Sequence, residues 1–334
     1  MTRRLAAARL VALALILGWP CAARAVDGVI EINHARALAG GVTPGDAPGY
    51  PVDLKVPGSY RLTGNLAQPD DKTIVIAVGA DGVSIDLNGF SIRGPMTCVA
   101  GYDAQHTFVT AVTCNGGNLS LAPGILAIST SSVSVSNGKI VGIAGPAFSL
   151  GPNSRVEQVE ILDCSNGAAV KSGSTVKSLR INRSRGGIRV DGGGALLEDI
   201  TVFECDASGG VLVSASSSIM NRITVTSSAG SGILAGEGSR LTDSLARRLS
   251  EDGIAADALA MVSGCISTYN HREGFFFDAD TVQWNNTVAR NDGGMFGLWE
   301  QGVMLGDGVC EDLHDPGELL PLKICPDYSS QQSP

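Results

Sequence analysis

GILA, at residues 124–127, is the first of eight copies of one short motif, a glycine followed by apolar residues. Successive copies lie 20 to 23 residues apart. An interval this regular is typical of repeat proteins, in which each unit is one small piece of supersecondary structure. The copies are GILA at Gly124, GPAF at Gly145, GAAV at Gly167, GIRV at Gly187, GVLV at Gly210, GILA at Gly232, GIAA at Gly253 and GFFF at Gly274.

The unit between two copies holds short apolar runs but no stretch with the 3.6-residue periodicity of a helix. It suits two or three short strands joined by turns rich in Gly, Ser, Asn and Asp. Coiling places each strand about 4.8 Å from its counterpart, and only a stack of units buries a continuous core. The sequence therefore predicts an all-β fold, a single-stranded right-handed parallel β-helix (a solenoid) of about ten coils. The leading glycine is expected to serve the turn geometry at each corner.

Two other repeat architectures fit less well. A β-propeller needs roughly 40 residues per blade, arranged as antiparallel hairpins, and that period is absent. A leucine-rich repeat has a similar length but requires leucine and asparagine at regular positions, which are missing from these units.

The β-helix is expected to occupy residues 67–303, with other segments before and after it. Residues 1–25 have the basic start, apolar run and small-residue cleavage site of a signal peptide. Residues 26–66 should form an N-terminal cap and the first strands, with a capping helix over 30–38 (IEINHARAL). Residues 304–334 should close the other end as a disulfide-closed cap loop and tail. Both covers are needed because an open strand edge invites pairing with another chain.

The charge and the apolar stretches limit the partners. A signal peptide, with no later stretch apolar enough to cross a bilayer, predicts a secreted or periplasmic protein without a membrane span. Loss of the four arginines in the signal segment takes the formal net charge from −9 to about −13. This charge repels nucleic acid and anionic lipid at long range, which argues against both as partners. We expect a monomer whose partner is an extracellular polysaccharide.

The chain has eight cysteines, and signal cleavage would remove Cys21. Export permits disulfides. Cys98 and Cys114 flank one excursion, and Cys310 and Cys325 flank another, so we expect a disulfide at each. The remaining three lie inside repeats and are expected to be buried thiols, since about 9.6 Å of stacking separates the two that share a column. These are Cys164 and Cys205, in one column, and Cys265, in another.

Several stretches carry a resemblance to a known family. They are residues 32–52 (INHARALAGGVTPGDAPGYPV), 57–66 (PGSYRLTGNL) and 83–95 (VSIDLNGFSIRGP), the glycine-led repeats, and the final Cys-Pro at 325–326. Together they resemble exported bacterial right-handed parallel β-helix proteins of the pectate-lyase-like superfamily, a largely uncharacterised group. The resemblance implies the fold. It implies little about function, because this fold carries lyases, hydrolases, epimerases and binding proteins.

We expect any ligand on the outward face of the strand that follows the leading glycine, two residues after it. This face is apolar and nearly uncharged, so it lacks the groups that a polyuronate lyase or a hydrolase with paired acids needs. Arg189, Phe276 and Trp299 are the candidate ligand-binding residues, with the two aromatic rings as a stacking platform. The alternative for the aromatics is the core of an end cap. The outward positions are Leu126, Ala147, Ala169, Arg189, Leu212, Leu234, Ala255 and Phe276, with a shift of one residue left open for the first two.

Polar residues gather in the turns before the last glycines. About one coil separates them, so Glu251, Arg272 and Asp292 should form one column, with Asp252 and His271 beside it. Acids, a base and hydrogen-bonding groups in one place make these five the candidate catalytic residues. The alternative is a solvated ladder of alternating charges.

No group of residues has the spacing of a metal site, and the four histidines are far apart in the sequence. Calcium stays open as a ligand at Asp70 with Asp71, or at Asp312 with Asp315, against the simpler interpretation of surface acids. No cofactor is identified.

These observations favour an exported, non-catalytic β-helix that recognises glycans or structures extracellular material. The alternative is a polysaccharide lyase or glycoside hydrolase that uses the candidate catalytic residues. A purely structural or adhesive surface protein is a third hypothesis.

Overall fold

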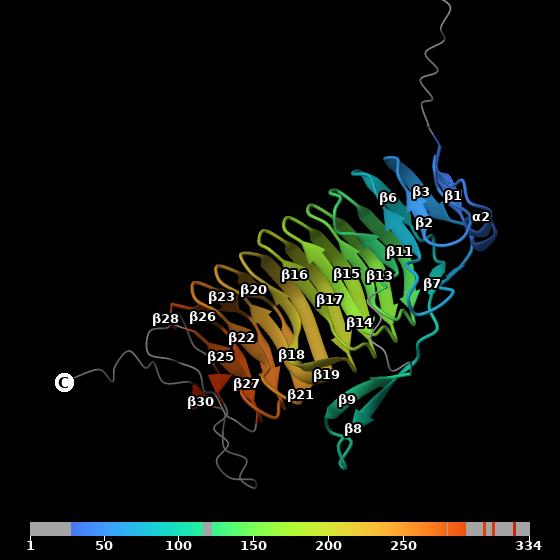
Figure 1. Cartoon of the computed structure of the whole chain (residues 1–334). Coiled ribbons are helices and arrows are strands. Elements are labelled where there is room, and N and C mark those ends of the chain that lie inside the picture. The colour runs from blue at the N-terminus through green and yellow to red at the C-terminus, as the bar shows by residue number, and fades with distance from the viewer. Residues whose placement is uncertain are drawn as a thin grey trace, which may run out of the picture.

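The chain forms a long solenoid whose coils follow one another in sequence order (Figure 1). The structure, a computed structural model, describes residues 28–115, 122–278 and 280–291, and the backbone alone at 208–209, 303–304, 309–310 and 323–324. Within this part, about eleven turns stack through parallel strand pairing. The predicted all-β parallel solenoid is confirmed.

Each coil contributes strands to two sheets, named sheet A and sheet B. Sheet B contains β2 (Val52–Leu54), β5 (Ile76–Val78), β10 (Ile125–Ala127), β12 (Pro146–Leu150), β14 (Asn166–Lys171), β16 (Ile188–Asp191), β18 (Asp206–Ala215), the end of β19 (Ile219–Ala235), β22 (Ile254–Ala256) and β25 (Phe275–Phe277). In sheet A, the first strands are β1 (Ile30–Ile32), β3 (Gly58–Leu62), β4 (Leu66–Ala67), β6 (Val83–Asp86), β7 (Ser91–Arg93), β11 (Ser134–Val141), β13 (Arg155–Leu162), β15 (Thr175–Asn182) and β17 (Leu196–Phe203). Sheet A continues with the start of β19 and with β20 (Arg240–Thr242), β21 (Leu245–Leu249), β23 (Met261–Ser263), β24 (Ile266–Thr268), β26 (Val282–Trp284), β27 (Thr287–Ala289), β28 (Val303–Met304), β29 (Val309–Cys310) and β30 (Lys323–Ile324).

Three left-handed residues turn the chain in each regular coil. One lies at the B-to-A corner, one at a bend within sheet A, and one at the A-to-B corner. Because adjacent coils pair in register, each kind of corner forms a column along the solenoid. The A-to-B column is Gly142, Asp163, Arg183, Glu204, Ser227, Arg248, Tyr269 and Arg290, with φ between 44° and 67°.

Most of these corner residues are not glycine, although a left-handed backbone is uncommon for other residues. The bend column is Asn137, Gln158, Ser178, Asp199, Arg222, Asp243, Gly264 and Asn285. The B-to-A column is Ser132, Asn153, Gly173, Gly194, Ser217, Gly238, Leu259 and Asp280. The local strain at each corner is offset by the coil-to-coil hydrogen bonds on either side of it.

The residue after each corner points into the solenoid, and where it is polar it binds the neighbouring coil. Asn270 Oδ1 accepts the backbone N–H of Leu249 at 3.1 Å, and Asn291 Oδ1 accepts that of Asn270 at 2.8 Å. In the bend column, Asn286 Oδ1 accepts the N–H of Cys265 at 3.0 Å. These side chains satisfy buried backbone donors that would otherwise lack a partner.

The three thiols occupy the same kind of inward position. Cys164 and Cys205 follow A-to-B corners, and Cys265 follows a bend in sheet A. All three are fully buried and free. Burial raises the pKa of each thiol to about 12, so none is a reactive nucleophile at neutral pH. The prediction of buried thiols is confirmed.

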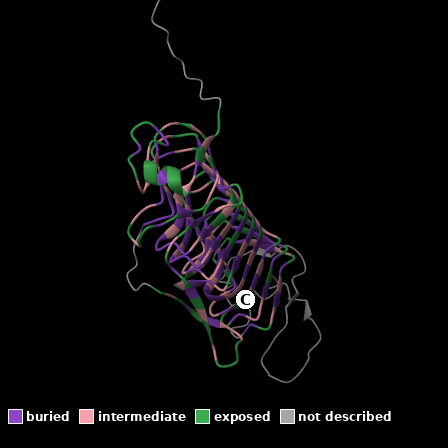
Figure 2. Ribbon diagram, turned by 90° about the vertical axis from the view of Figure 1, so that its right-hand side faces the viewer, coloured by how far each residue is buried: buried purple, intermediate pink, exposed green. Residues whose placement is uncertain are grey.

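Apolar side chains fill the space between the sheets, so buried segments run through the whole interior (Figure 2). The leading glycines lie against this core, and their predicted role was wrong. Gly167, Gly187 and Gly253 have no left-handed backbone. Each is needed because a Cβ would collide with its surroundings, at 1.8 Å from Gly187 O in the case of Gly167. These positions therefore lack room for a side chain, and the corners lie elsewhere.

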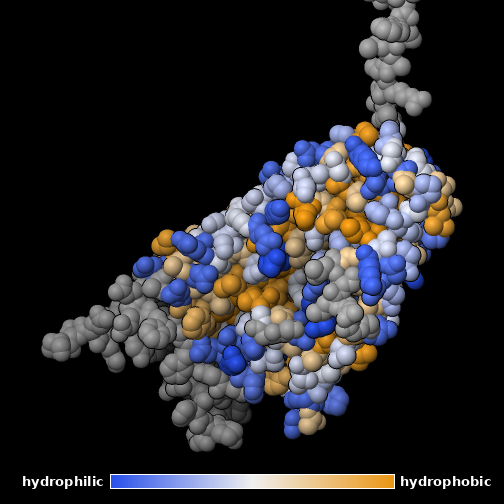
Figure 3. All heavy atoms as spheres, viewed as in Figure 1, coloured by the Kyte–Doolittle hydropathy of each residue, from blue (hydrophilic) through white to orange (hydrophobic). Residues whose placement is uncertain are grey.

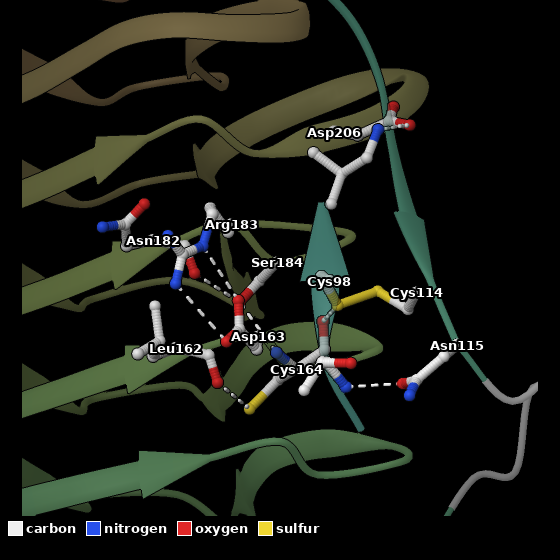
Figure 4. Close-up of a disulfide and its surroundings, with 12 residues drawn as sticks. Cys98, Cys114, Asn115, Leu162, Asp163, Cys164, Asn182, Arg183, Ser184 and Asp206 are labelled. Atoms are coloured by element: carbon white, nitrogen blue, oxygen red, sulfur yellow. Dashed lines mark hydrogen bonds and ion pairs between the residues drawn. A yellow bond between two sulfur atoms is a disulfide. The ribbon is translucent and has the colours of Figure 1, made fainter. Parts of the chain in front are cut away.

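The excursion after β7 is a β-hairpin, formed by β8 (Cys98–Tyr102) and β9 (Val109–Cys114). The Cys98–Cys114 disulfide closes its base, as predicted, and lies beside the Asp163–Arg183 ion pair and Cys164 (Figure 4). The hairpin packs on the A-to-B corners. The N–H of Val112 donates to Asp206 Oδ2 at 3.1 Å. The other predicted disulfide needs Cys325, which lies outside the described residues.

The N-terminal segment differs from its prediction. Residues 30–32 form β1, which pairs in parallel with β3, rather than the start of a helix. The helix is α2 (His34–Ala39), which begins after the Asn33 side chain accepts the N–H of Arg36 at 3.0 Å. The Ile-Glu-Ile run favours a strand because its apolar residues alternate with a polar one. The predicted signal peptide at 1–25 lies outside the described residues.

A glycine-to-alanine pair tests the role of the leading glycines. In Gly253→Ala, the new Cβ would lie 1.9 Å from Ser267 Oγ and 2.5 Å from Asn270 Nδ2. Overpacking should lower the free energy of unfolding by about 2 kcal/mol. The control is Gly79→Ala, whose Cβ meets Lys55 Cγ at an ordinary 3.8 Å. Urea unfolding followed by circular dichroism measures both, and equal stability of the two variants would contradict the assignment.

Candidate functional site

The outward face of sheet B presents one residue from each coil. In chain order this column is Asp53, Ala77, Leu126, Ser149, Ala169, Arg189, Ser214, Leu234, Ala255 and Phe276. Two predicted members were wrong, since Ala147 and Leu212 are fully buried. Ile125 pairs with Phe148 and Ile188 with Val213, so Ala147 and Leu212 occupy the position that glycine fills in other coils. Ser149 and Ser214 face outward instead.

The C-terminal end of this column is a small apolar platform, defined as Leu234, Ala255 and Phe276. Phe276 is 41% exposed, whereas Phe275 and Phe277 on either side of it are 2% and 3% exposed. The predicted outward orientation of Phe276 is confirmed. The surface of the solenoid carries apolar areas interrupted by strongly hydrophilic side chains (Figure 3). The platform is of this mixed kind, because charged groups flank its strands at both ends.

The first flank, where the sheet B strands begin, contains four of the five candidate catalytic residues. The N–H of Arg272 approaches Glu251 O at 3.4 Å, which places the two in neighbouring coils of one column, as expected. Ser231 Oγ donates to Glu251 Oε2 at 3.2 Å. His271 is exposed, and its ring centroid lies 5.7 Å from that of Phe108 in the hairpin. Asp292, the fifth candidate, lies outside the described residues.

Glu273 belongs to this flank, although it was not among the predicted site residues. Its N–H donates to Asp252 Oδ1 at 3.2 Å, and its own Oε2 is buried with no hydrogen-bond partner among the described residues. Burial raises the pKa of Glu273, and the charge of Asp252 adds to the shift while Arg272 opposes it. Its position directly before a leading glycine, one coil after Asp252, was the signal in the sequence.

A second acidic flank lies where the same strands end, and it too was missed. Asp257 and Asp278 directly follow β22 and β25 and take the same place in successive coils, since each donates its N–H to the coil before at 2.9 Å. Partial burial raises the pKa of Asp257, with contributions from the charges of Asp278 and Glu237. An acid directly after the apolar run in two consecutive repeats was the available signal. Carboxylates therefore border the platform on both sides.

The remaining predicted ligand residues are less well placed. Arg189 is exposed on sheet B but pairs with Asp191 on its own strand, with Nε 2.9 Å from Oδ1, so its charge is already compensated. Trp299 lies outside the described residues. Across the described ranges, no group of three or more His, Cys, Asp or Glu side chains could hold a metal ion. The same residues include no helix long and apolar enough to span a membrane.

Replacing the partly buried carboxylate of Glu273 tests the electrostatics of the first flank. A raised pKa means that folded Glu273 holds its proton more tightly than the unfolded chain does, so stability falls as pH rises from the ordinary glutamate pKa through the raised one. Glu273→Gln should therefore raise Tm at pH 8 and leave it unchanged at pH 3. Glu251→Gln removes a neighbouring charge without relieving a buried oxygen. Equal Tm changes for the two variants at pH 8 would contradict this account.

A match to a family model supports the architecture. A family model described as a right handed beta helix region matches residues 124–293. No curated protein matches the chain. Two solved structures of the GH136 lacto-N-biosidase from Eubacterium ramulus are similar. The native protein has 9% identity and a TM-score of 0.37, covering 75% of this chain and 63% of that one. The selenomethionine derivative has 8% identity and a TM-score of 0.32, with 81% and 66% covered.

The present chain thus spans less than two thirds of that enzyme's chain. The family match covers 124–293, which includes every glycine-led repeat identified in the sequence. These are also the coils that carry the platform and its two flanks. The chain belongs to the right-handed β-helix family.

Proposed function

We propose that this protein is an exported, non-catalytic β-helix that binds a neutral extracellular glycan on the C-terminal coils of sheet B. The observation that carries the proposal is an exposed aromatic ring, Phe276, within an uncharged strip of sheet whose strands end in carboxylates on both sides. Sugars have apolar C–H faces that pack on aromatic rings, and hydroxyl groups that donate to carboxylates. The platform and its flanks offer both kinds of contact.

The charge of the flanks selects among glycans. Glu251, Asp252 and Glu273 lie on one side and Asp257 and Asp278 on the other. These five carboxylates outnumber Arg272, the arginine of the first flank, so together they would repel a uronate polymer. A neutral or amino sugar avoids this repulsion. The proposed ligand is therefore an uncharged or basic glycan rather than a polyuronate.

The cellular location and the oligomeric state of the protein form part of the same proposal. The signal-peptide pattern at 1–25 supports a secreted or periplasmic location, and the disulfide of the hairpin is compatible with an oxidising compartment. We propose a monomer, with 26–66 and 304–334 as the segments that end the solenoid.

A glycoside hydrolase or polysaccharide lyase is the second candidate, favoured by one observation. The raised pKa values of Glu273 and Asp257 would keep a carboxyl group protonated to higher pH, as a general acid requires. On this hypothesis, Glu251, Asp252, His271 and Arg272 would assist the acid. The binding hypothesis is preferred because Asp252 and Asp257 lie on opposite ends of the strands, and the intervening sheet carries no polar group that reaches across.

Loss of the aromatic ring tests the binding platform. Phe276→Ala should weaken binding to a neutral oligosaccharide about tenfold, the equivalent of about 1.4 kcal/mol of lost stacking. The control is Phe203→Ala, which removes a ring that is 37% exposed on sheet A. A glycan array selects the oligosaccharide, and titration calorimetry measures the affinities.

Reducing-sugar and unsaturated-product assays on the same glycans test for catalysis. Turnover that Glu273→Gln, His271→Ala or Glu251→Gln abolishes would replace the binding hypothesis with the enzymatic one. Neither binding nor turnover across a broad panel of neutral glycans would contradict both carbohydrate hypotheses.

A further inference from the structure

The hairpin of β8 and β9 runs along the solenoid rather than around it, and Figure 4 shows its strands crossing the stacked coils. At its base, Cys98 Sγ lies 4.0 Å from Cys164 O. At its tip, the ring of Phe108 contacts that of His271, with the two centroids 5.7 Å apart. Cys164 and His271 follow A-to-B corners that are five coils apart, so the hairpin reaches over about 24 Å.

The side chains of the hairpin do not belong to the solenoid core. Its buried residues, Cys98, Val109 and Val112, form a small cluster with Ala229 that is separate from the core between the sheets. Strand β7, before the excursion, pairs directly with β11, after it. The hairpin thus leaves the stacking of the coils intact and ends at the candidate site. A connection of this kind, on the surface of a rigid scaffold, is where binding residues are often found.

The tip of the hairpin is held in one conformation. Asp103 Oδ1 accepts the N–H groups of Thr107 and Phe108 at 2.6 Å and 3.0 Å, and the N–H of Asp103 donates to Phe108 O at 3.0 Å. Behind the tip, the Tyr102 hydroxyl donates to Glu204 at the corner. Phe108 is therefore fixed in place before a ligand arrives, which lowers the entropy lost on binding.

Phe108 and His271, named the ring pair, lie on the other side of the first flank from the platform. His271 is exposed and Phe108 is partly exposed. Arg272 and Glu273 follow His271 and precede the strand that carries Phe276. Extended backbone from 271 to 276 spans at most about 17 Å. The polar groups of the first flank therefore lie between two aromatic surfaces.

We propose, on the basis of the glycan binding proposed above, that the ring pair is a second sugar subsite and that the whole site selects oligosaccharides over single sugars. One sugar ring packs on Phe276 and another on Phe108 and His271, while the hydroxyl groups of the segment between them donate to the carboxylates of the first flank. The ligand is a neutral oligosaccharide long enough to span both surfaces. Its second contact forms within a complex that the first already holds, so the contact adds affinity without a second cost of association.

Titration calorimetry of the full chain against oligosaccharides of increasing length tests the subsite. The probes are homo-oligomers of glucose and of N-acetylglucosamine up to the hexasaccharide, and the length series of any other neutral glycan that the array selects. We expect the affinity to rise at least tenfold from the shortest oligomer that binds to one that spans both surfaces. Phe108→Leu keeps an apolar side chain against His271 but removes the ring, so it should abolish this rise and keep the affinity for the shortest oligomer within twofold.

Two further variants separate the ring from the packing of the hairpin. Phe108→Tyr keeps the ring and should keep the rise in affinity. The matched control is Tyr102→Leu, which removes a ring that is 38% exposed and lies over the corner rather than the flank, and it should behave like the unsubstituted protein. Loss of the rise in either variant would assign the effect to the attachment of the hairpin and would overturn the subsite.

The length series also distinguishes failure of the subsite from failure of the platform. Binding that Phe276→Ala weakens, with no dependence on length or on Phe108, would overturn the subsite and leave the platform in place. Absence of binding in every length series would overturn both.

Discussion

The register between coils is the constraint on which every other feature depends. Each coil must return to the same position one strand spacing further along, about 4.8 Å, with its backbone hydrogen bonds intact. Three left-handed corners per coil achieve this, and they form three columns because like positions pair. Once the register is set, every side chain belongs to a column. A column that points inward builds the core, and one that points outward builds a surface feature.

The inward columns explain the polar composition of the interior. Serine and asparagine follow the corners because their side chains accept backbone N–H groups of the coil before, as Ser184 does for Cys164 at 3.2 Å. A thiol or an aliphatic group takes the same place in other coils, as Cys164, Cys205 and Leu249 do. Stacking also limits the room at the leading glycines. The solenoid therefore uses a buried polar network to hold the corners and an apolar core to hold the sheets.

The repeat period predicted the fold and much of the register, because a stacked coil is a local unit that one sequence interval specifies. It placed Phe276 outward and Glu251 beside Arg272. The repeat period could not predict features that depend on contacts between side chains of different coils. These are the lack of space for a Cβ at Gly253, the buried oxygen of Glu273, and the stacking of Arg247 on Tyr269. The sequence wrongly placed Ala147 and Leu212 on the outward face. Extra residues before the strands β12 and β18 move the glycine-led motif out of register with the strand, so both residues take the glycine position.

The deletion of one whole coil tests the central claim most directly. Removing residues 232–252 joins Ser231 to Gly253, which occupies the next equivalent place in the column. The account predicts that this shortened protein keeps the circular dichroism spectrum and the cooperative urea unfolding of the full chain, whereas removal of 232–242 abolishes both. Loss of the folded state in both variants, or its retention in both, would contradict the claim that the coil is the unit of the structure.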